Sequence, residues 1–193
     1  MTDIVQSGAG LLFMKVGTHA QEKLEDIIAR KTKEIEDTGY GMWGYGGNTC
    51  HPRSMVQPFV EMFHDRDRPI YLLMEEMESK HFAEPVRADQ YSIDGRNWKD
   101  VPNTVNVLGS RFALVLSSLR KQEETIPLAR TRVPIGPSTG RLGSRYLRGR
   151  VDKACLEVLA ESELINEEDR REIRCNLVAE LKQPYAVFLR NKT

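Results

Sequence analysis

Apolar and polar positions near the start of the chain predict a strand, a helix and a second strand. Residues 11–16 form an apolar run with one lysine that stops at Gly17, as a buried strand would. The apolar positions that follow recur at helical spacing, and Gly39 stands where that helix would end. Residues 40–45 can form a strand, although their glycines suggest a bend or a close backbone approach. The helical stripe, interrupted by one lysine, comprises Leu24, Ile27, Ile28, Lys31 and Ile35.

Two capping signals predict where helices begin. Thr18 is followed at the third position by Gln21, which has the form of a capping box for the first helix. Ser54 and Gln57 repeat this spacing before a second, shorter helix. We expect Pro58 to lie in the first turn of that helix, where a missing N–H is tolerated. The apolar face of the second helix comprises Val56, Phe59, Val60 and Phe63.

The middle of the chain has the pattern of β structure with irregular connections. An Asp-Gly pair at Asp94 predicts a tight turn. Pro134 would confine the end of the last β-rich run to a sheet edge, because proline cannot donate a ladder hydrogen bond. The β-rich runs are residues 70–74, 104–108, 111–116 and 128–135.

The spacing of apolar residues predicts that the C-terminal third, residues 144–183, is mostly helical. Ser144 can cap one helix and Asn166 a second, with Pro184 following at the expected stop. Residues 185–189 have the pattern of a terminal strand. The stripe of the first helix comprises Leu147, Val151, Ala154, Cys155, Val158 and Leu159, and that of the second comprises Ile173, Leu177, Val178 and Leu181.

Strands and helices are interspersed without regular alternation. This order favours an α+β or irregular α/β fold, with a mixed β-sheet and about four helices in a single domain spanning residues 1–193. A small, partly closed β-barrel with flanking helices is the alternative architecture. A chain of 193 residues buries roughly 70% of its unfolded surface, so it needs no disulfide or metal to fold. Its hydrophobic fraction of 40% and charged fraction of 29% exclude disorder and coiled coil as descriptions of the whole chain.

The cysteines and the start of the chain predict a cytoplasmic protein. Three cysteines are an odd number without framework spacing, which favours free thiols in a reducing compartment. The first residues lack the basic start and apolar stretch of a secretory signal, and no apolar run approaches the length of a membrane span. We therefore expect no membrane partner, and the side-chain pattern predicts neither a metal nor a cofactor.

Residues 130–150, here called the arginine segment, contain the main candidate for ligand binding. No acidic residue occurs between Glu124 and Asp152, although 28 basic and 28 acidic residues balance over the whole chain. The planar guanidinium holds phosphate or carboxylate oxygens in two parallel hydrogen bonds. A glycine-rich stretch, residues 136–144, leads into the predicted helix, whose N-terminus would add N–H groups and partial positive charge. The predicted phosphate-binding residues are Arg130, Arg132, Arg141, Ser144, Arg145 and Arg148.

Helical spacing would place Arg141, Arg145 and Arg148 on one face, since they stand at i, i+4 and i+7. The alternative interpretation is that the arginines are paired within the folded protein. Their partners would then be the acidic residues of segment 161–169, or Glu75, Glu76 and Glu78.

Residues 41–52, here called the glycine–aromatic loop, predict a stacking surface. Glycines alternate with Trp43 and Tyr45, and aromatic faces beside flexible backbone suit contact with a base. The alternative is a bent strand whose rings pack in the core.

The catalytic candidates are His19, Cys50, Glu75 and Glu76. Cys50 precedes His51, but adjacent residues of an extended strand point to opposite faces, so this histidine is poorly placed to activate the thiol. His19 follows the first predicted strand, at the end where open sheets commonly bind ligands. The cysteines and histidines do not follow a structural zinc spacing.

These features favour a binding module that recognises a phosphate-bearing partner, a nucleic acid or a nucleotide, through the arginine segment and the glycine–aromatic loop. The zero net charge argues against coating of nucleic acid by bulk attraction. One alternative is an enzyme acting on a nucleotide or phosphorylated small molecule. Another is an inhibitor or adaptor that binds a second protein, because interfaces are also enriched in arginine and aromatic residues.

Overall fold

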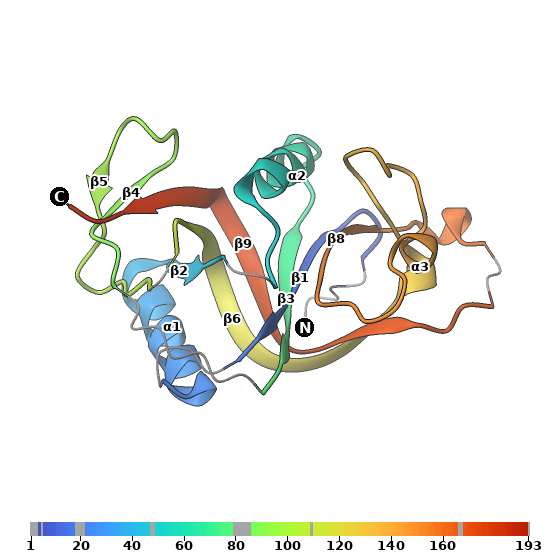
Figure 1. Cartoon of the computed structure of the whole chain (residues 1–193), viewed down its shortest axis with the longest axis horizontal. Helices are drawn as coiled ribbons and strands as arrows, with labels where there is room; N and C mark the ends of the chain where they lie inside the picture. Colours follow the sequence, from blue (N-terminus) through green and yellow to red (C-terminus); the bar gives the residue numbers. More distant parts are fainter. Residues whose placement is uncertain are drawn as a thin grey trace.

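Two long antiparallel strands, β6 (Phe112–Pro127) and β9 (Glu172–Arg190), run through the middle of a mixed sheet (Figure 1). The computed structural model describes residues 4, 6–17, 22–46, 49–78, 86–108, 110–165 and 168–192. Within them the strand order is β2-β6-β9-β3-β1-β8-β7, and β4 joins β5 to the C-terminal part of β9. Three register shifts interrupt the β6–β9 ladder. Such irregularities bend a strand pair, and both strands curve strongly.

The remaining strands are short. The strands are β1 (Gly10–Val16), β2 (Gly41–Gly44), β3 (Ile70–Glu76), β4 (Gln90–Ser92), β5 (Lys99–Asp100), β7 (Thr131–Arg132) and β8 (Lys153–Val158). The helices are α1 (Leu24–Thr38), α2 (Arg53–Asp65) and α3 (Gly143–Tyr146), with the 3₁₀ helices η1 (Leu128–Arg130) and η2 (Glu161–Glu163).

The parallel pair β1–β3 forms the centre of the core. Its register runs from Gly10 opposite Ile70 to Val16 opposite Glu76, and the connection contains α1, β2 and α2. Both helices pack on the face that presents Leu12 and Leu72. The alternate residues face the opposite side, where η1 and the ends of β6 and β9 cover them. Burial on both faces explains why these strands read as continuous apolar runs.

The sequence predictions for the N-terminal half are largely confirmed. β1, α1, β2, α2 and β3 occur where the hydrophobic pattern predicts them, and Gly39 ends α1 in the left-handed conformation with φ 77°. The N-termini of the two helices differ from those that the sequence predicts. Lys23 and Pro52 are the N-caps of α1 and α2, and neither makes a side-chain cap bond, so the capping box at Ser54 is wrong. Pro58 lies inside α2, beyond its first turn. Thr18 and Gln21 lie outside the described residues.

The predicted helices of the C-terminal third are wrong. The segment after Ser144 is helical for a single turn, α3, and the next apolar run is strand β8. Residues 172–190 form β9, while Asn166 lies outside the described residues. Ile173 and Leu177 are four residues apart, but Cys175 between them is buried as well, which is the alternation of a strand. A spacing of four residues fits both the helical and the strand period. Pairing with β6, which is distant in the sequence, determines that this segment is a strand.

The remaining predictions for the middle of the chain and the architecture have mixed outcomes. The turn at Asp94 joins β4 to β5, and β6 begins at Phe112, within the predicted run 111–116. Residues 104–108 are irregular, and only Thr131–Arg132 of residues 128–135 form a strand. The α+β class with a mixed sheet is confirmed, although the described residues contain three α-helices and about four were predicted. The barrel alternative is wrong, because no ladder among the described strands connects β2 with β7 to close the sheet.

A buried ion pair fastens α1 to the loop before β6. Lys31 and Glu34 are 3% and 2% exposed, and the Lys31 Nζ lies 2.9 Å from the Glu34 Oε2. The same ammonium donates to the Asn106 carbonyl at 2.6 Å, while the Glu34 Oε1 accepts the Asn106 N–H at 2.9 Å. Burial lowers the pKa of Lys31 to about 8, although the Glu34 carboxylate opposes this shift. The lysine that interrupts the apolar stripe therefore has a structural partner.

Substitution Glu34→Ala should lower the free energy of unfolding by about 3–5 kcal/mol, because it leaves the buried Lys31 ammonium without its carboxylate. The double variant Lys31→Met/Glu34→Leu should recover most of this loss, since it removes both charges. Glu36→Ala, at an exposed position of the same helix, is the control. Urea denaturation measures all three, and a cost below about 1 kcal/mol for Glu34→Ala would contradict the role of the pair.

Candidate anion-binding site

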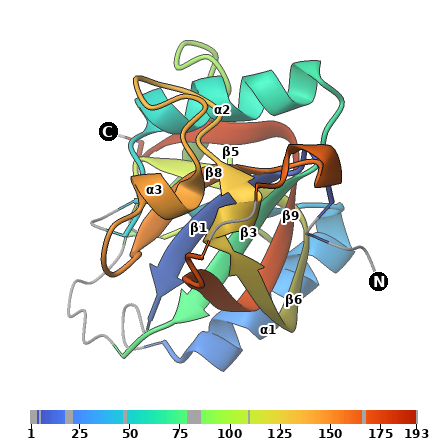
Figure 2. The same ribbon diagram turned by 90° about the vertical axis from the view of Figure 1, so that its right-hand side faces the viewer.

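The arginine segment forms a tight turn and a single helical turn at the β7 edge of the sheet. After β7 the chain reverses: the Val133 N–H donates to the Arg141 carbonyl, and the Gly140 N–H donates to the Val133 carbonyl, both at 2.8 Å. α3 follows and packs closely on η1 and β7. A Cβ on Gly143 would lie 2.1 Å from the Thr131 Oγ1, so glycine is required for this approach. Figure 2 shows α3 at the surface of this end of the molecule.

A concavity of about 700 Å³ opens between this turn, α3 and the start of β9. Four of its lining residues carry guanidinium groups, and none of the described lining residues is acidic. The volume is within the range of about 300–1,000 Å³ that small-molecule sites occupy. The lining residues are Thr139, Gly140, Arg141, Leu142, Ser144, Arg145, Arg148, Ile165 and Arg171.

Arg171 fixes the wall of this concavity. Its Nη1 donates to the Leu147 carbonyl at 2.5 Å, and its Nη2 donates to the Ser144 carbonyl. Asp169 accepts from the same guanidinium, and these hydrogen bonds lower the pKa of Asp169. The side chain therefore connects the chain just before β9 to both ends of α3. No sequence pattern indicates this role of Arg171, because it depends on contacts with residues more than twenty positions away along the chain.

Several arginines of the segment are paired with carboxylates. The Arg130 Nη2 lies 2.9 Å from the Glu161 Oε1. The Arg132 Nε lies 2.9 Å from the Glu157 Oε2, and its Nη1 lies 2.6 Å from the Glu163 Oε1. The Ala160 N–H and the Arg132 guanidinium together lower the pKa of Glu163. Arg150 lies 3.1 Å from Asp152. Pairing of Arg130 and Arg132 with the acidic segment agrees with the alternative interpretation of the sequence, and it leaves them less available to an external anion.

Arg141 and Arg148 differ from these residues. Both are exposed and line the concavity, and neither has an ion-pair or hydrogen-bond partner for its guanidinium among the residues that the structure describes. Arg145 is also exposed and lines the same concavity, whereas Ser144 is buried at 2% exposure. The structure thus brings Arg141, Ser144, Arg145 and Arg148 together, while it places Arg130 and Arg132 in ion pairs beside them.

Two details of the predicted phosphate site are wrong. α3 is only four residues long, so Arg141 precedes it and Arg148 follows it, and the predicted helical face does not exist. The amides of the glycine-rich turn are also engaged within the turn: those of Thr139, Gly140 and Arg141 donate to carbonyls of the same loop. Guanidinium groups, rather than backbone N–H groups or a helix N-terminus, are therefore the donors that face the concavity.

The predicted stacking residues lie elsewhere. Trp43 is 5% exposed and Tyr45 is 0% exposed, and the Tyr45 ring packs edge-on against Phe112 at 5.5 Å between centroids. Both belong to the core, as the alternative interpretation expected. Their strand region, β2, is at the opposite end of the strand order from β7, and Figure 1 shows β2 and α3 at opposite ends of the molecule. The glycine–aromatic loop and the arginine segment therefore do not form one site.

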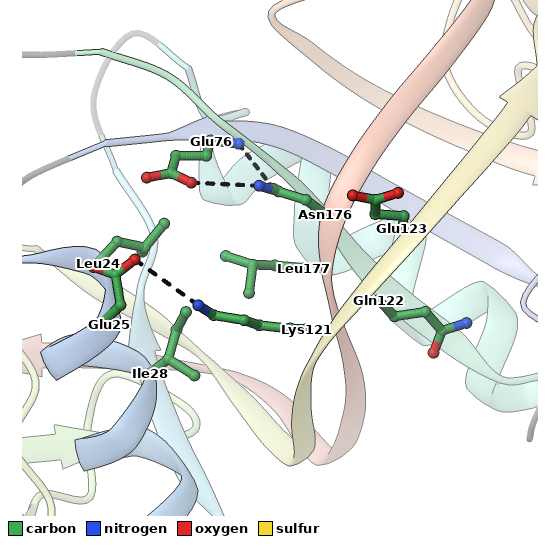
Figure 3. A pocket seen from close by; sticks show the side chains of 9 residues that line it. All are labelled: Leu24, Glu25, Ile28, Glu76, Lys121, Gln122, Glu123, Asn176 and Leu177. Atoms are coloured by element: carbon green, nitrogen blue, oxygen red, sulfur yellow. Dashed lines mark hydrogen bonds and ion pairs between the residues drawn. The ribbon is translucent and has the colours of Figure 1, made fainter.

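The described catalytic candidates do not converge with the arginines. Glu75 lies 3.1 Å from the Lys15 ammonium. Glu76 lines a smaller concavity, of about 260 Å³, between α1 and the strands β3, β6 and β9 (Figure 3). Its N–H donates to the Asn176 Oδ1 at 3.0 Å, and the Asn176 amide nitrogen lies 3.4 Å from its carboxylate. No residue of the arginine segment lines this concavity, and His19 lies outside the described residues.

Cys50 and His51 are also unsuited to a nucleophile–base pair. Cys50 is 4% exposed, and burial raises the pKa of its thiol to about 11. Burial lowers the pKa of His51 to about 4. At neutral pH both groups are uncharged, whereas an activated pair needs a thiolate. The Lys153 Nζ donates to the Cys50 carbonyl at 3.2 Å, which connects this loop to the start of β8.

Comparison with protein families, curated proteins and solved structures found no match to this chain. Across the part of the chain that the structure covers, no cluster of three or more histidine, cysteine or acidic side chains could hold a metal ion. None of the helices seen there has the length and apolar character needed to cross a bilayer.

The three thiols should react slowly with Ellman's reagent in the native protein at pH 8. All are buried, and burial raises their pKa values to about 11 for Cys50 and about 12 for Cys155 and Cys175. We expect native labelling to be at least ~100-fold slower than labelling in guanidinium chloride, because the reagent attacks thiolates. Rapid stoichiometric labelling of Cys50 in the native protein would contradict its buried, protonated state.

Acidification from pH 6.5 to pH 4 should destabilise the protein partly through His51. Its pKa falls from 6.5 to about 4 on folding, so the unfolded chain binds more protons in this range and the free energy of unfolding decreases as the pH falls. His51→Asn should make this decrease shallower, as measured by urea denaturation at a series of pH values. The control for loss of a histidine is His64→Asn, at an exposed position of α2. An unchanged slope in His51→Asn would argue against the burial effect.

Proposed function

We propose that the protein is a binding module for a phosphate-bearing partner, a nucleic acid or a nucleotide, which it holds at the concavity of the arginine segment. The observation that carries this proposal is the exposure of Arg141 and Arg148 on one concave surface, with no carboxylate partner for either in the described parts of the chain. Elsewhere in the segment the half-buried Arg130 and Arg132 and the exposed Arg150 are neutralised by acidic residues.

The charge of the concavity favours a dianionic ligand group. It contains four guanidinium groups and no acidic lining residue among those described. Asp169 interacts with Arg171 at its margin. A guanidinium can hold two phosphate oxygens in parallel hydrogen bonds, which a carboxylate-bearing side chain in the same place would prevent. The concavity therefore presents donors without internal acceptors for at least two of its arginines.

The backbone that carries these arginines is fixed before any ligand arrives. Arg141 stands at the end of the turn closed by the paired Val133 and Arg141 backbone groups. Arg171 holds the carbonyl groups on either side of the segment that carries Arg145. A preorganised site loses less conformational freedom on binding, so more of the interaction energy appears as affinity.

The proposal is tested by fluorescence anisotropy with a labelled oligonucleotide over a series of salt concentrations. A nucleotide is then added as a competitor. Binding should weaken as salt rises, because phosphate contacts release counterions. Arg141→Gln and Arg148→Gln should each reduce affinity and lower the slope of log K against log salt by about 0.7–0.9. Arg132→Gln should affect stability more than affinity, since Glu157 and Glu163 already hold this side chain.

The matched control is Arg96→Gln. Arg96 is exposed in the turn between β4 and β5, at the opposite end of the molecule from α3 (Figure 1). Its substitution removes the same charge as Arg141→Gln. It should leave affinity and salt slope unchanged. Absence of binding to both probes at low salt, or an equal loss in Arg96→Gln and Arg141→Gln, would overturn the proposed site.

A further inference from the structure

An exposed aromatic ring stands inside the arginine segment. Tyr146, the last residue of α3, is 36% exposed, and it is the one aromatic residue among the exposed large hydrophobic residues of the described chain. Ile165, which lines the concavity, is another member of that set at 50% exposure. Trp43 and Tyr45, which the sequence predicted to stack on a base, are by contrast buried in the core.

The backbone beneath Tyr146 is held on both sides. Its N–H donates to the Leu142 carbonyl at 2.9 Å. Arg171 donates to the carbonyl groups of Ser144 and Leu147, the residues on either side of the Arg145–Tyr146 pair. The partly exposed ring is therefore carried by a turn with a fixed backbone, next to the exposed Arg145 and two residues before Arg148.

The position of the ring distinguishes a short ligand from an extended one. Tyr146 does not line the concavity, whereas Arg141, Arg145 and Arg148 do. A ligand with phosphate groups in the concavity reaches Tyr146 only if it continues past the rim of the concavity. A chain of nucleotides meets this requirement, since successive phosphates and bases alternate along it. Cationic groups that follow a backbone, combined with aromatic rings that accept bases, are the features of single-strand binding.

A duplex fits these features less well. Its bases are stacked on one another and do not present their faces to a tyrosine. Proteins that read a duplex commonly place a helix or a two-stranded ribbon in the major groove. α3 is a single turn of four residues and has no length to follow a groove.

We infer that the partner is a single-stranded nucleic acid, whose phosphates bind in the concavity at Arg141 and Arg148 and whose adjacent base stacks on Tyr146. The inference rests on the proposed function and adds the class of ligand. Tyr146 contributes through its ring face rather than through charge, so its effect is independent of salt concentration.

The experiment compares a labelled 12-nucleotide thymidine oligomer with a 12-unit abasic oligomer of the same charge, with the corresponding duplex and with thymidine monophosphate. The protein is the full chain, as wild type and as Tyr146→Ala, Tyr146→Phe and Arg141→Gln, and circular dichroism checks that each variant is folded. The oligomer should bind about 5- to 100-fold more tightly than its abasic counterpart, because base stacking on an aromatic ring contributes this much per base.

Tyr146→Ala should reduce oligomer affinity to the level of the abasic chain while leaving abasic affinity and the salt slope unchanged. Tyr146→Phe should retain the wild-type affinity, since it keeps the ring. Equal binding of oligomer and abasic chain, an unaffected Tyr146→Ala, tighter binding of the duplex, or equal binding of the monophosphate would overturn the inference. If Arg141→Gln still weakens binding in those cases, the proposed function stands without it. If no probe binds the wild type at low salt, both fail.

Discussion

The fold depends on the pairing of β9, because one strand supplies backbone hydrogen bonds to three neighbours. β9 pairs with β6 along most of its length, with β3 through Leu177–Glu180, and with β4 near its end. Its side chains enter all three groups of buried residues: Leu181 on the α1 and α2 side, Ile173 on the opposite side, and Val187 beneath β4. Loss of this strand would therefore open every part of the core.

The position of the candidate site depends on the same strand. Arg171 directly precedes β9, and its guanidinium holds the carbonyl groups of Ser144 and Leu147. The position of α3 therefore follows from the position of β9. The arginines of the segment then divide into two kinds. Arg130 and Arg132 interact with acidic residues that follow β8 or lie within it, and so stabilise the β7 edge. Arg141 and Arg148 extend into the concavity, where the ligand would supply the negative charge.

The sequence correctly predicted the elements whose hydrophobic pattern fits only one type of secondary structure. The stripe of α2 could only be helical, and Val56, Phe59 and Phe63 are all fully buried. It failed where two periods share the same positions, as at Ile173 and Leu177, because only pairing with β6 makes that segment a strand. Among site residues, the sequence identified Arg141 and Arg148 but could not reveal which arginines were paired. Glu157 and Glu161 reach Arg132 and Arg130 only in the folded sheet. Tyr146 is an aromatic residue between Arg145 and Arg148 in the sequence, but only the folded structure shows that it is exposed.

In the proposed binding mode, phosphate groups bind at the arginine concavity, and no other part of the molecule binds them with comparable affinity. The most direct test of this mode is a nuclear magnetic resonance titration that follows the arginine Nε–Hε resonances as a thymidine oligomer is added at low salt. The largest shifts should occur at Arg141 and Arg148, with smaller ones at Arg145 and none at Arg96. Shifts that are largest at Arg96, or that spread evenly over all the arginines, would contradict the proposed binding mode.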